Sequence, residues 1–274
     1  MKSQLSQSVG LPESVGEKQD DPITREFIGH AMKVHSAVGP GLNEELYHQE
    51  LVGALTTAGM PHVSKPKRDL VYRGIAADTF EPDFVVQDHF IPELKCLRGP
   101  FAPAHLVQVF CYCKFWQIRS SLLVDFGKQS LQWKRLLYRS RAGLLPDIDP
   151  PANIPNRDLA ANMVAAVGDC LHELGLGYRE STWKGLVSAA LQAAGLRIRT
   201  SPSATVLGHP ETLFSSLVVE DTCAVLVTAL TDGITASDRA ILQTHLRWLN
   251  LGWGIVLHFG KTNADFAFVN RLNK

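Results

Sequence analysis

The chain has 274 residues, of which 45% are hydrophobic and 20% are charged, and its formal net charge at neutral pH is zero. This length allows two domains of ordinary size, each with its own core. Zero net charge argues against a protein that coats nucleic acid by bulk electrostatic attraction, and the lack of an apolar run of about 18 residues argues against a membrane-spanning helix.

The five cysteines are an odd number, lie in apolar surroundings and form no Cys-x-x-Cys pair; they are Cys96, Cys111, Cys113, Cys170 and Cys223. This pattern favours buried thiols in a reducing cytoplasm over disulfides or a zinc site. Residues 1–21 are polar and lack the apolar segment of a secretory signal, so we expect them to form a disordered leader.

Two helices are predicted after the leader. Pro22 can begin the first, whose apolar residues recur at three-to-four spacing. The Gly39-Pro40-Gly41 sequence interrupts it, and Asn43 can cap a second helix that continues to about residue 58. Glu44 then lies in the first turn, where the helix dipole favours a carboxylate; this structural role competes with a catalytic one.

Strands are predicted at about 61–65 and 69–74, then a β-hairpin of about 80–86 and 90–96. A helix from about Pro103 to Trp116 and a buried strand from Ser121 to Phe126 follow. Further on, basic residues form a run that contains no acidic residue and has Trp133 and Tyr138 between its members: Lys128, Lys134, Arg135, Arg139 and Arg141. Such a run is more typical of a solvated helix face, although a phosphate backbone could also lie there.

The hairpin carries Asp83 on one arm and Glu93 and Lys95 on the other. Strand alternation puts the Glu93 and Lys95 side chains on one face, while Leu94 points toward a core. A turn centred on Asp88 would place Asp83 opposite Glu93. Two opposed carboxylates repel each other, so Lys95 or a divalent ion such as Mg²⁺ would have to compensate. The alternative is a solvated hairpin face, which the apolar residues around the triplet disfavour.

Two neighbouring features bear on this site. Pro92 cannot donate a ladder hydrogen bond, so the second strand should be bulged there or lose pairing on one side. On the predicted helix, His105, Gln108 and Tyr112 share one face and form a polar stripe that can meet the hairpin.

The proline-rich segment 145–157 is interpreted as a linker between domains at 22–144 and 158–274. The second half repeats the first: GPGLNEELY at 39–47 matches GLGYRESTW at 175–183, and FGK at 126–128 recurs at 259–261. The repeat keeps scaffold positions but loses the charged site, because the positions of Asp83, Glu93, Lys95 and Gln108 are taken by Ser216, Leu226, Thr228 and Ile241.

Three motifs over about residues 22–137 resemble a known group. Gly41-x-x-Glu44-x-x-Tyr47 resembles the motif that names the GxxExxY family, and Pro82-Asp83 with Glu93-Leu94-Lys95 resembles the PD-(D/E)XK nuclease signature of its superfamily. Gln108 with Tyr112 is similar to the QxxxY element, whereas Pro92 departs from the strand pattern. The resemblance implies an α/β protein with two tandem PD-(D/E)XK nuclease-like domains, each a central mixed sheet flanked by helices, with a degenerate second copy.

The resemblance also implies a metal-dependent phosphodiester hydrolase. Asp83 and Glu93 would bind Mg²⁺ or Mn²⁺, with Glu44 and the Leu94 carbonyl as further ligands. Lys95 would orient or activate water and stabilise charge on the phosphate, and the substrate would be contacted by Gln108, Tyr112 and Tyr47.

The partner implied is nucleic acid, with DNA favoured over RNA. We further expect a cytoplasmic protein with no membrane segment, in which the two halves pack as an intramolecular pseudo-dimer. A competing interpretation remains open: a non-catalytic nucleic-acid- or protein-binding module that has kept a nuclease-like scaffold.

Overall fold

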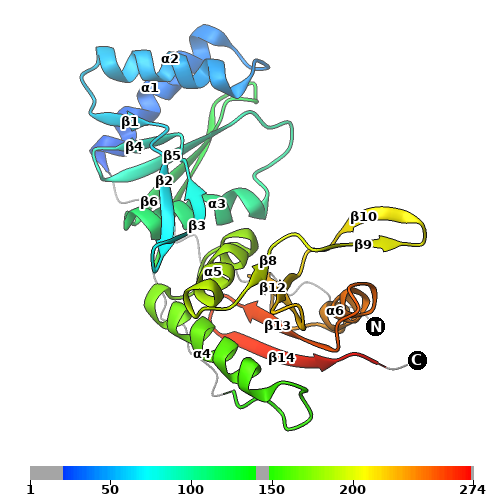
Figure 1. Cartoon of the computed structure of the whole chain (residues 1–274). Helices are drawn as coiled ribbons and strands as arrows, with labels where there is room; N and C mark the ends of the chain where they lie inside the picture. The colour runs from blue at the N-terminus through cyan, green and yellow to red at the C-terminus, as the bar shows by residue number, and fades with distance from the viewer. Residues whose placement is uncertain (1–20, 140–147, 273–274) are drawn as a thin grey trace, which may run out of the picture. The chain divides into compact units, whose positions relative to one another are not determined.

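The computed structural model describes residues 21–139 and 148–272, which form helices α1–α6 and strands β1–β14 (Figure 1). The predicted leader, apart from Asp21, and the first residues of the predicted linker lie outside the described residues. The described chain divides into two compact units, one of residues 21–67 and Glu81–Arg139, the other of Arg68–Phe80 and 148–272. Both units combine helices with mixed sheets, so the predicted α/β class is confirmed.

Helices α1 (Pro22–Val38) and α2 (Glu44–Thr57) open the first unit. The Asp21 carboxylate accepts a hydrogen bond from the Ile23 backbone N–H, and the Asn43 side chain accepts one from Leu46. These caps satisfy backbone donors that a helix leaves unpaired at its first turn. Both predicted helix starts are therefore confirmed, and Glu44 is the first residue of α2.

A five-stranded sheet forms the centre of the first unit, in the order β1-β4-β5-β6-β7. Its strands are β1 (His62–Ser64), β4 (Phe84–Val86), β5 (Phe90–Lys95), β6 (Ser120–Asp125) and β7 (Gln132–Leu137). Strands β5 and β6 are parallel and are joined through α3 (Pro103–Trp116), whereas the other neighbours in this sheet are antiparallel.

The sheet of the first unit has an apolar core on each face. Helices α1 and α2 contribute to a cluster that includes Phe27, Leu51, Phe84, Leu94 and Val124. Helix α3 contributes to a second cluster with Val109, Phe110, Leu123 and Leu136. Because Leu123 and Val124 are neighbours on one strand but belong to different clusters, the two clusters lie on opposite faces of the sheet.

Two sequence predictions for the first half were wrong. No strand was predicted at residues 75–79, but they lie in β3 (Ile75–Phe80), which pairs with β2 (Arg68–Tyr72) in a hairpin. The strand predicted at about 80–86 is shorter than expected, because only β4 (Phe84–Val86) forms there. The run of basic residues favoured as a helix face contains strand β7 instead. Strand β7 pairs with β6 along its whole length, and this pairing outweighs local helix preference.

The second unit also contains a five-stranded sheet, in the order β14-β13-β12-β11-β8, in which β12 and β13 are parallel and the other neighbours antiparallel. The second half of the chain has its helices and strands in the same order as residues 22–137: α4 (Arg157–Leu174), α5 (Glu180–Ala193), β8 (Ile198–Arg199), β9 (Ser203–Val206), β10 (His209–Leu213), β11 (Leu217–Val219), β12 (Cys223–Ala229), α6 (Ala236–Trp248), β13 (Trp253–Phe259) and β14 (Ala264–Asn270).

The β2–β3 hairpin belongs to this second unit although it lies within the first half of the sequence. Its Asp78 carboxylate accepts hydrogen bonds from the Thr182 hydroxyl and from Arg179 beside helix α5. A Cβ atom at Gly185 would lie 1.8 Å from the Ala77 carbonyl oxygen, so only glycine permits this close approach of backbone to helix. The hairpin ends at Phe80, three residues before Asp83 in the sequence.

Candidate active site

The β4–β5 turn is built as the sequence predicts. Val86 pairs with Phe90, which centres the turn on Asp88, and both Gln87 and Asp88 adopt positive φ angles. Pairing between β4 and β5 is confined to Val86 and Phe90, whereas β5 pairs with β6 without a register shift through Pro92. The proline therefore coincides with lost pairing on one side of the strand, one of the two outcomes expected for it.

Asp83 is hydrogen-bonded to both Glu93 and Leu94 across this hairpin. The Asp83 carboxylate accepts a hydrogen bond from the Leu94 backbone N–H at 2.8 Å, and the Asp83 backbone N–H donates to Glu93 Oε2 at 3.3 Å. Lys95 Nζ donates to Glu93 Oε1 at 2.8 Å, while the Leu94 side chain is fully buried in the core. The structure thus brings the charged triplet together and separates Leu94 from it by strand alternation.

Helix α3 adds two of the three polar residues that were expected to share its face. Gln108 Nε2 donates to Glu93 Oε1 at 2.8 Å and to the Tyr112 hydroxyl at 3.0 Å, and that hydroxyl donates to the Glu81 carbonyl. His105 has a different partner, because its Nδ1 accepts a hydrogen bond from Ala102 at the start of the helix. The polar stripe therefore reaches the hairpin through Gln108 and Tyr112.

Helix α2 directs Glu44 toward the same cluster but not Tyr47. Burial raises the pKa of Glu44, although the charge of Lys95 and a hydrogen bond from the Cys96 backbone act in the opposite direction. Tyr47 is fully buried; its hydroxyl donates to the Gly39 carbonyl, and its ring stacks on Phe126. These contacts give Tyr47 a structural role in the turn between α1 and α2.

His48 is a member of this cluster that the sequence reasoning did not identify. Its side chain is 5% exposed, and its Nδ1 lies 3.7 Å from Asp83 Oδ1. Burial lowers the pKa of His48, which favours the neutral imidazole. The sequence signal was its position four residues after Glu44, which places both side chains on one face of α2.

Glu93 is the most perturbed carboxylate of the cluster. Burial, and next the negative charge of Asp83, raise the pKa of Glu93 to about 7. Lys95 offsets only part of this effect: burial disfavours its charge, but the attraction of Glu93 raises the pKa of Lys95, so the amine stays protonated. Two carboxylates and one lysine therefore leave a buried site short of positive charge.

The donor set suits a hard divalent ion. Within the described ranges, no three His, Cys, Asp or Glu side chains are close enough together to form a complete metal site. Mg²⁺, however, usually keeps several waters and uses one or two protein carboxylates together with substrate phosphates. Asp83 and Glu93 meet this requirement, and their mutual repulsion, which contributes to the raised pKa of Glu93, is what a cation would relieve.

Two members of the basic run have protein partners. Lys128 Nζ donates to the carbonyls of Leu97 and Gly99, and Arg135 contacts the Asp21 carboxylate at 2.9 Å. These two residues therefore hold neighbouring segments together. Arg141, also in the run, lies outside the described residues.

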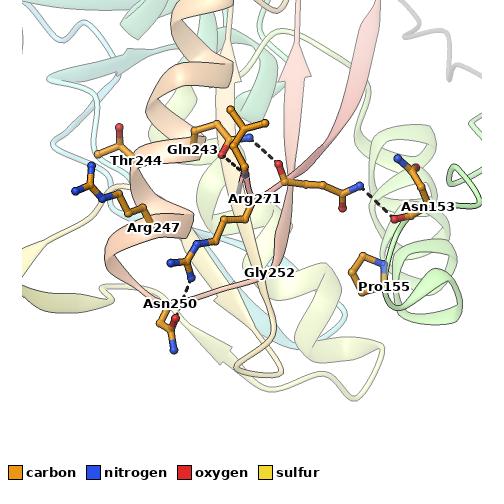
Figure 2. A pocket seen from close by; sticks show the side chains of 10 residues that line it. Asn153, Pro155, Gln243, Thr244, Arg247, Asn250, Gly252 and Arg271 are labelled. Atoms are coloured by element: carbon orange, nitrogen blue, oxygen red, sulfur yellow. Dashed lines mark hydrogen bonds between the residues drawn. The ribbon is translucent and has the colours of Figure 1, made fainter. Parts of the chain in front are cut away.

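The second unit contains an open polar pocket of about 920 Å³ (Figure 2). Arg271 donates to the Asn250 side chain at its edge, and Gln243 donates to the Asn270 carbonyl. Its lining holds no carboxylate and none of the site residues predicted from the sequence: Asn153, Pro155, Gln243, Thr244, Arg247, Asn250, Gly252, Asn270, Arg271 and Leu272. Because it lacks acidic groups, this pocket cannot share the chemistry of the Asp83–Glu93 cluster.

Comparison with family models finds a match over residues 21–136. No curated protein matches the chain. In the parts of the chain that the structure describes, no helix combines the length and apolar character needed to cross a membrane. The matching model is that of the PD-(D/E)XK nuclease superfamily, and the matched segment contains Glu44, Asp83, Glu93, Lys95, Gln108 and Tyr112.

Proposed function

We propose that the first half of the chain is a metal-dependent nuclease that hydrolyses phosphodiester bonds in nucleic acid, DNA in preference to RNA. One observation carries the proposal: Asp83, Glu93 and Lys95 form a largely buried, hydrogen-bonded cluster inside a segment that matches a nuclease superfamily. Within that superfamily we assign the chain to the GxxExxY family, on the motif formed by Gly41, Glu44 and Tyr47.

In this proposal Asp83 and Glu93 hold Mg²⁺ or Mn²⁺, with Glu44 and the Leu94 carbonyl as additional ligands. A divalent ion held there would supply Lewis-acid activation of water and of the phosphate. Lys95, charged and largely buried, would place its amine where negative charge develops on the phosphate.

Gln108 and Tyr112 keep a role in positioning the phosphate. Gln108 also holds the Glu93 carboxylate through a hydrogen bond from its side-chain amide. Tyr47 was predicted to contact substrate, but its complete burial supports no such role in this proposal.

The test is cleavage of labelled DNA and RNA with Mg²⁺ or Mn²⁺ by the wild type and by Asp83→Asn, Glu93→Gln and Lys95→Met. We expect cleavage that excess chelator abolishes and that each substitution reduces at least about a hundredfold. His105→Gln is the matched control, because His105 lies on the same helix as Gln108 but hydrogen-bonds to the start of that helix. Cleavage that survives all three substitutions would remove the site assignment.

We further propose that the second half, residues 158–274, is a degenerate tandem copy of the first, residues 22–144, joined by the linker 145–157. The matching order and direction of strands in the two sheets support this proposal. Ser216 precedes β11 as Asp83 precedes β4, and it hydrogen-bonds His245. Leu226 and Thr228 lie in β12 as Glu93 and Lys95 lie in β5. The pseudo-dimer of the two halves stays a prediction.

A non-catalytic binding module is the second candidate function. It is favoured by the lack of three clustered metal ligands among the described residues. Binding of nucleic acid without cleavage in the presence of any divalent ion tested would support this second candidate. The five cysteines all lie in the described residues and form no disulfide, which supports the proposal of a reducing, cytoplasmic location.

A further inference from the structure

The imidazole of His48 is fixed in place from two sides. Its Nε2 hydrogen-bonds the Ser64 hydroxyl at 2.7 Å, and its ring stacks on Phe84 with centroids 4.4 Å apart and planes 19° apart. Ser64 in β1 is the register partner of Phe84 in β4, so both contacts come from strand residues next to Asp83. A ring held in this way keeps its second nitrogen aimed in one direction.

That second nitrogen, Nδ1, is buried and has no hydrogen-bond partner in the described part of the chain. His48 as a whole is 4% exposed, so bulk water does not satisfy the atom. Leaving a buried polar atom unpaired costs its lost hydration with no compensating bond, which makes an unpaired Nδ1 an unfavourable final state. The group it faces is Asp83 Oδ1, 3.7 Å away, too far for a hydrogen bond.

A metal ion accounts for this separation. Nitrogen and oxygen ligands lie about 2.0–2.2 Å from a small divalent ion, so two ligands of one ion are roughly 3 to 4 Å apart. The Ser64 contact fits the same interpretation, because a ligating imidazole usually hydrogen-bonds through its other nitrogen, and this bond fixes the ring.

We propose that His48 Nδ1 and Asp83 Oδ1 are ligands of one divalent ion, and that this imidazole makes the site prefer a transition metal such as Mn²⁺ to Mg²⁺. The proposal rests on the metal-dependent site proposed above and adds a ligand and a metal preference to it. Carboxylates suit Mg²⁺, but imidazole nitrogen suits transition metals better. Glu44, four residues before His48 on α2, lies on the same helix face.

The test uses Mn²⁺ as a spectroscopic probe of the full-length protein. Pulsed electron paramagnetic resonance detects ¹⁴N coupling when an imidazole binds Mn²⁺. We expect coupling in the wild type and in His62→Gln, and none in His48→Gln. His62 is a matched control, because it also contacts the Phe84 ring but its Nδ1 is occupied by the Met60 carbonyl.

Calorimetry gives a second readout. In His48→Gln, Mn²⁺ affinity should fall at least about tenfold, whereas Mg²⁺ affinity should change less than about twofold. If His48→Gln does not fold, His48→Asn replaces it, and the absence of ¹⁴N coupling from the wild-type spectrum would be decisive on its own. A wild-type spectrum without ¹⁴N coupling, or coupling that persists without His48, would overturn the proposal.

The outcomes separate this proposal from the proposed function. Metal-dependent cleavage that requires Asp83, together with a site of oxygen ligands alone, would reject the His48 ligand and keep the nuclease. Nitrogen coupling from His48 without cleavage of any nucleic acid would keep the metal site and reject the nuclease.

Discussion

The raised pKa of Glu93 predicts that metal binding weakens as the solution becomes acidic. The carboxylate must lose its proton to bind an ion, and burial beside Asp83 raises the pKa of Glu93 to about 7. At pH 6 only about a tenth of the carboxyl groups are ionised, so the apparent Mg²⁺ affinity should be about tenfold lower there than at pH 8. Burial lowers the pKa of His48, which favours the neutral imidazole that is able to bind an ion.

The same shift has a consequence for stability in the metal-free protein. Because the folded-state pKa of Glu93 lies above its usual 4.5, the folded state binds more protons between about pH 4.5 and 7. The stabilisation of the folded state by Glu93 is therefore fully present below pH 4.5 and is lost as the pH rises through 7. At 1.36 kcal/mol per pH unit, the loss is about 3 kcal/mol.

Both effects can be measured with two variants. Calorimetry gives Mg²⁺ affinity at pH 6, 7 and 8, and carbon NMR of labelled glutamate carboxyls follows the Glu93 titration directly. Glu93→Gln should remove the high-pH titration, and Asp83→Asn should lower its midpoint, because the charge of Asp83 raises the pKa of Glu93. A Glu93 midpoint at or below 4.5 in chelator, or an affinity that does not change between pH 6 and 8, would refute this reasoning.

Three further substitutions test other parts of the structure. Gly185→Ala should destabilise the protein by more than about 1 kcal/mol, because the new Cβ atom would overlap the Ala77 carbonyl. Gly29→Ala in α1 is the control: its Cβ atom would have open space, so it should not destabilise the protein, and thermal unfolding measures both variants. Asn43→Ala removes the α2 cap and should cost about 1 kcal/mol in urea unfolding; an unchanged midpoint would contradict the cap. Glu44→Gln should lower metal affinity if Glu44 is a ligand; if it only complements the helix dipole, stability should change by about 0.3–1 kcal/mol and metal affinity not at all.

Local chemistry made several elements of this chain predictable. Pro22 and Asn43 mark helix starts through capping, and the apolar face of residues 103–116 defines α3. The Asp83–Glu93 contact followed from simple counting around a turn centred on Asp88, and alternation alone separated Leu94 from its neighbours.

Elements that depend on distant partners were not predictable in the same way. Strand β3 contains Asp78, a poor strand former, whose carboxylate binds Thr182 and Arg179 from far along the chain. His48 belongs to no motif and gains its place only because β1 and β4 bring Ser64 and Phe84 to its ring. Such relationships follow from tertiary packing, which a single sequence does not display.

The β2–β3 hairpin has a consequence for how the protein is made. The ribosome adds about 5–20 residues per second, and Thr182, the partner of Asp78, lies 104 residues later in the chain. The hairpin is therefore made roughly 5–20 seconds before helix α5 is available to bind it. In that interval the α5 helix of a neighbouring, finished chain could capture it, which is a route to domain swapping. A truncation that ends in the linker would leave the hairpin permanently in this state.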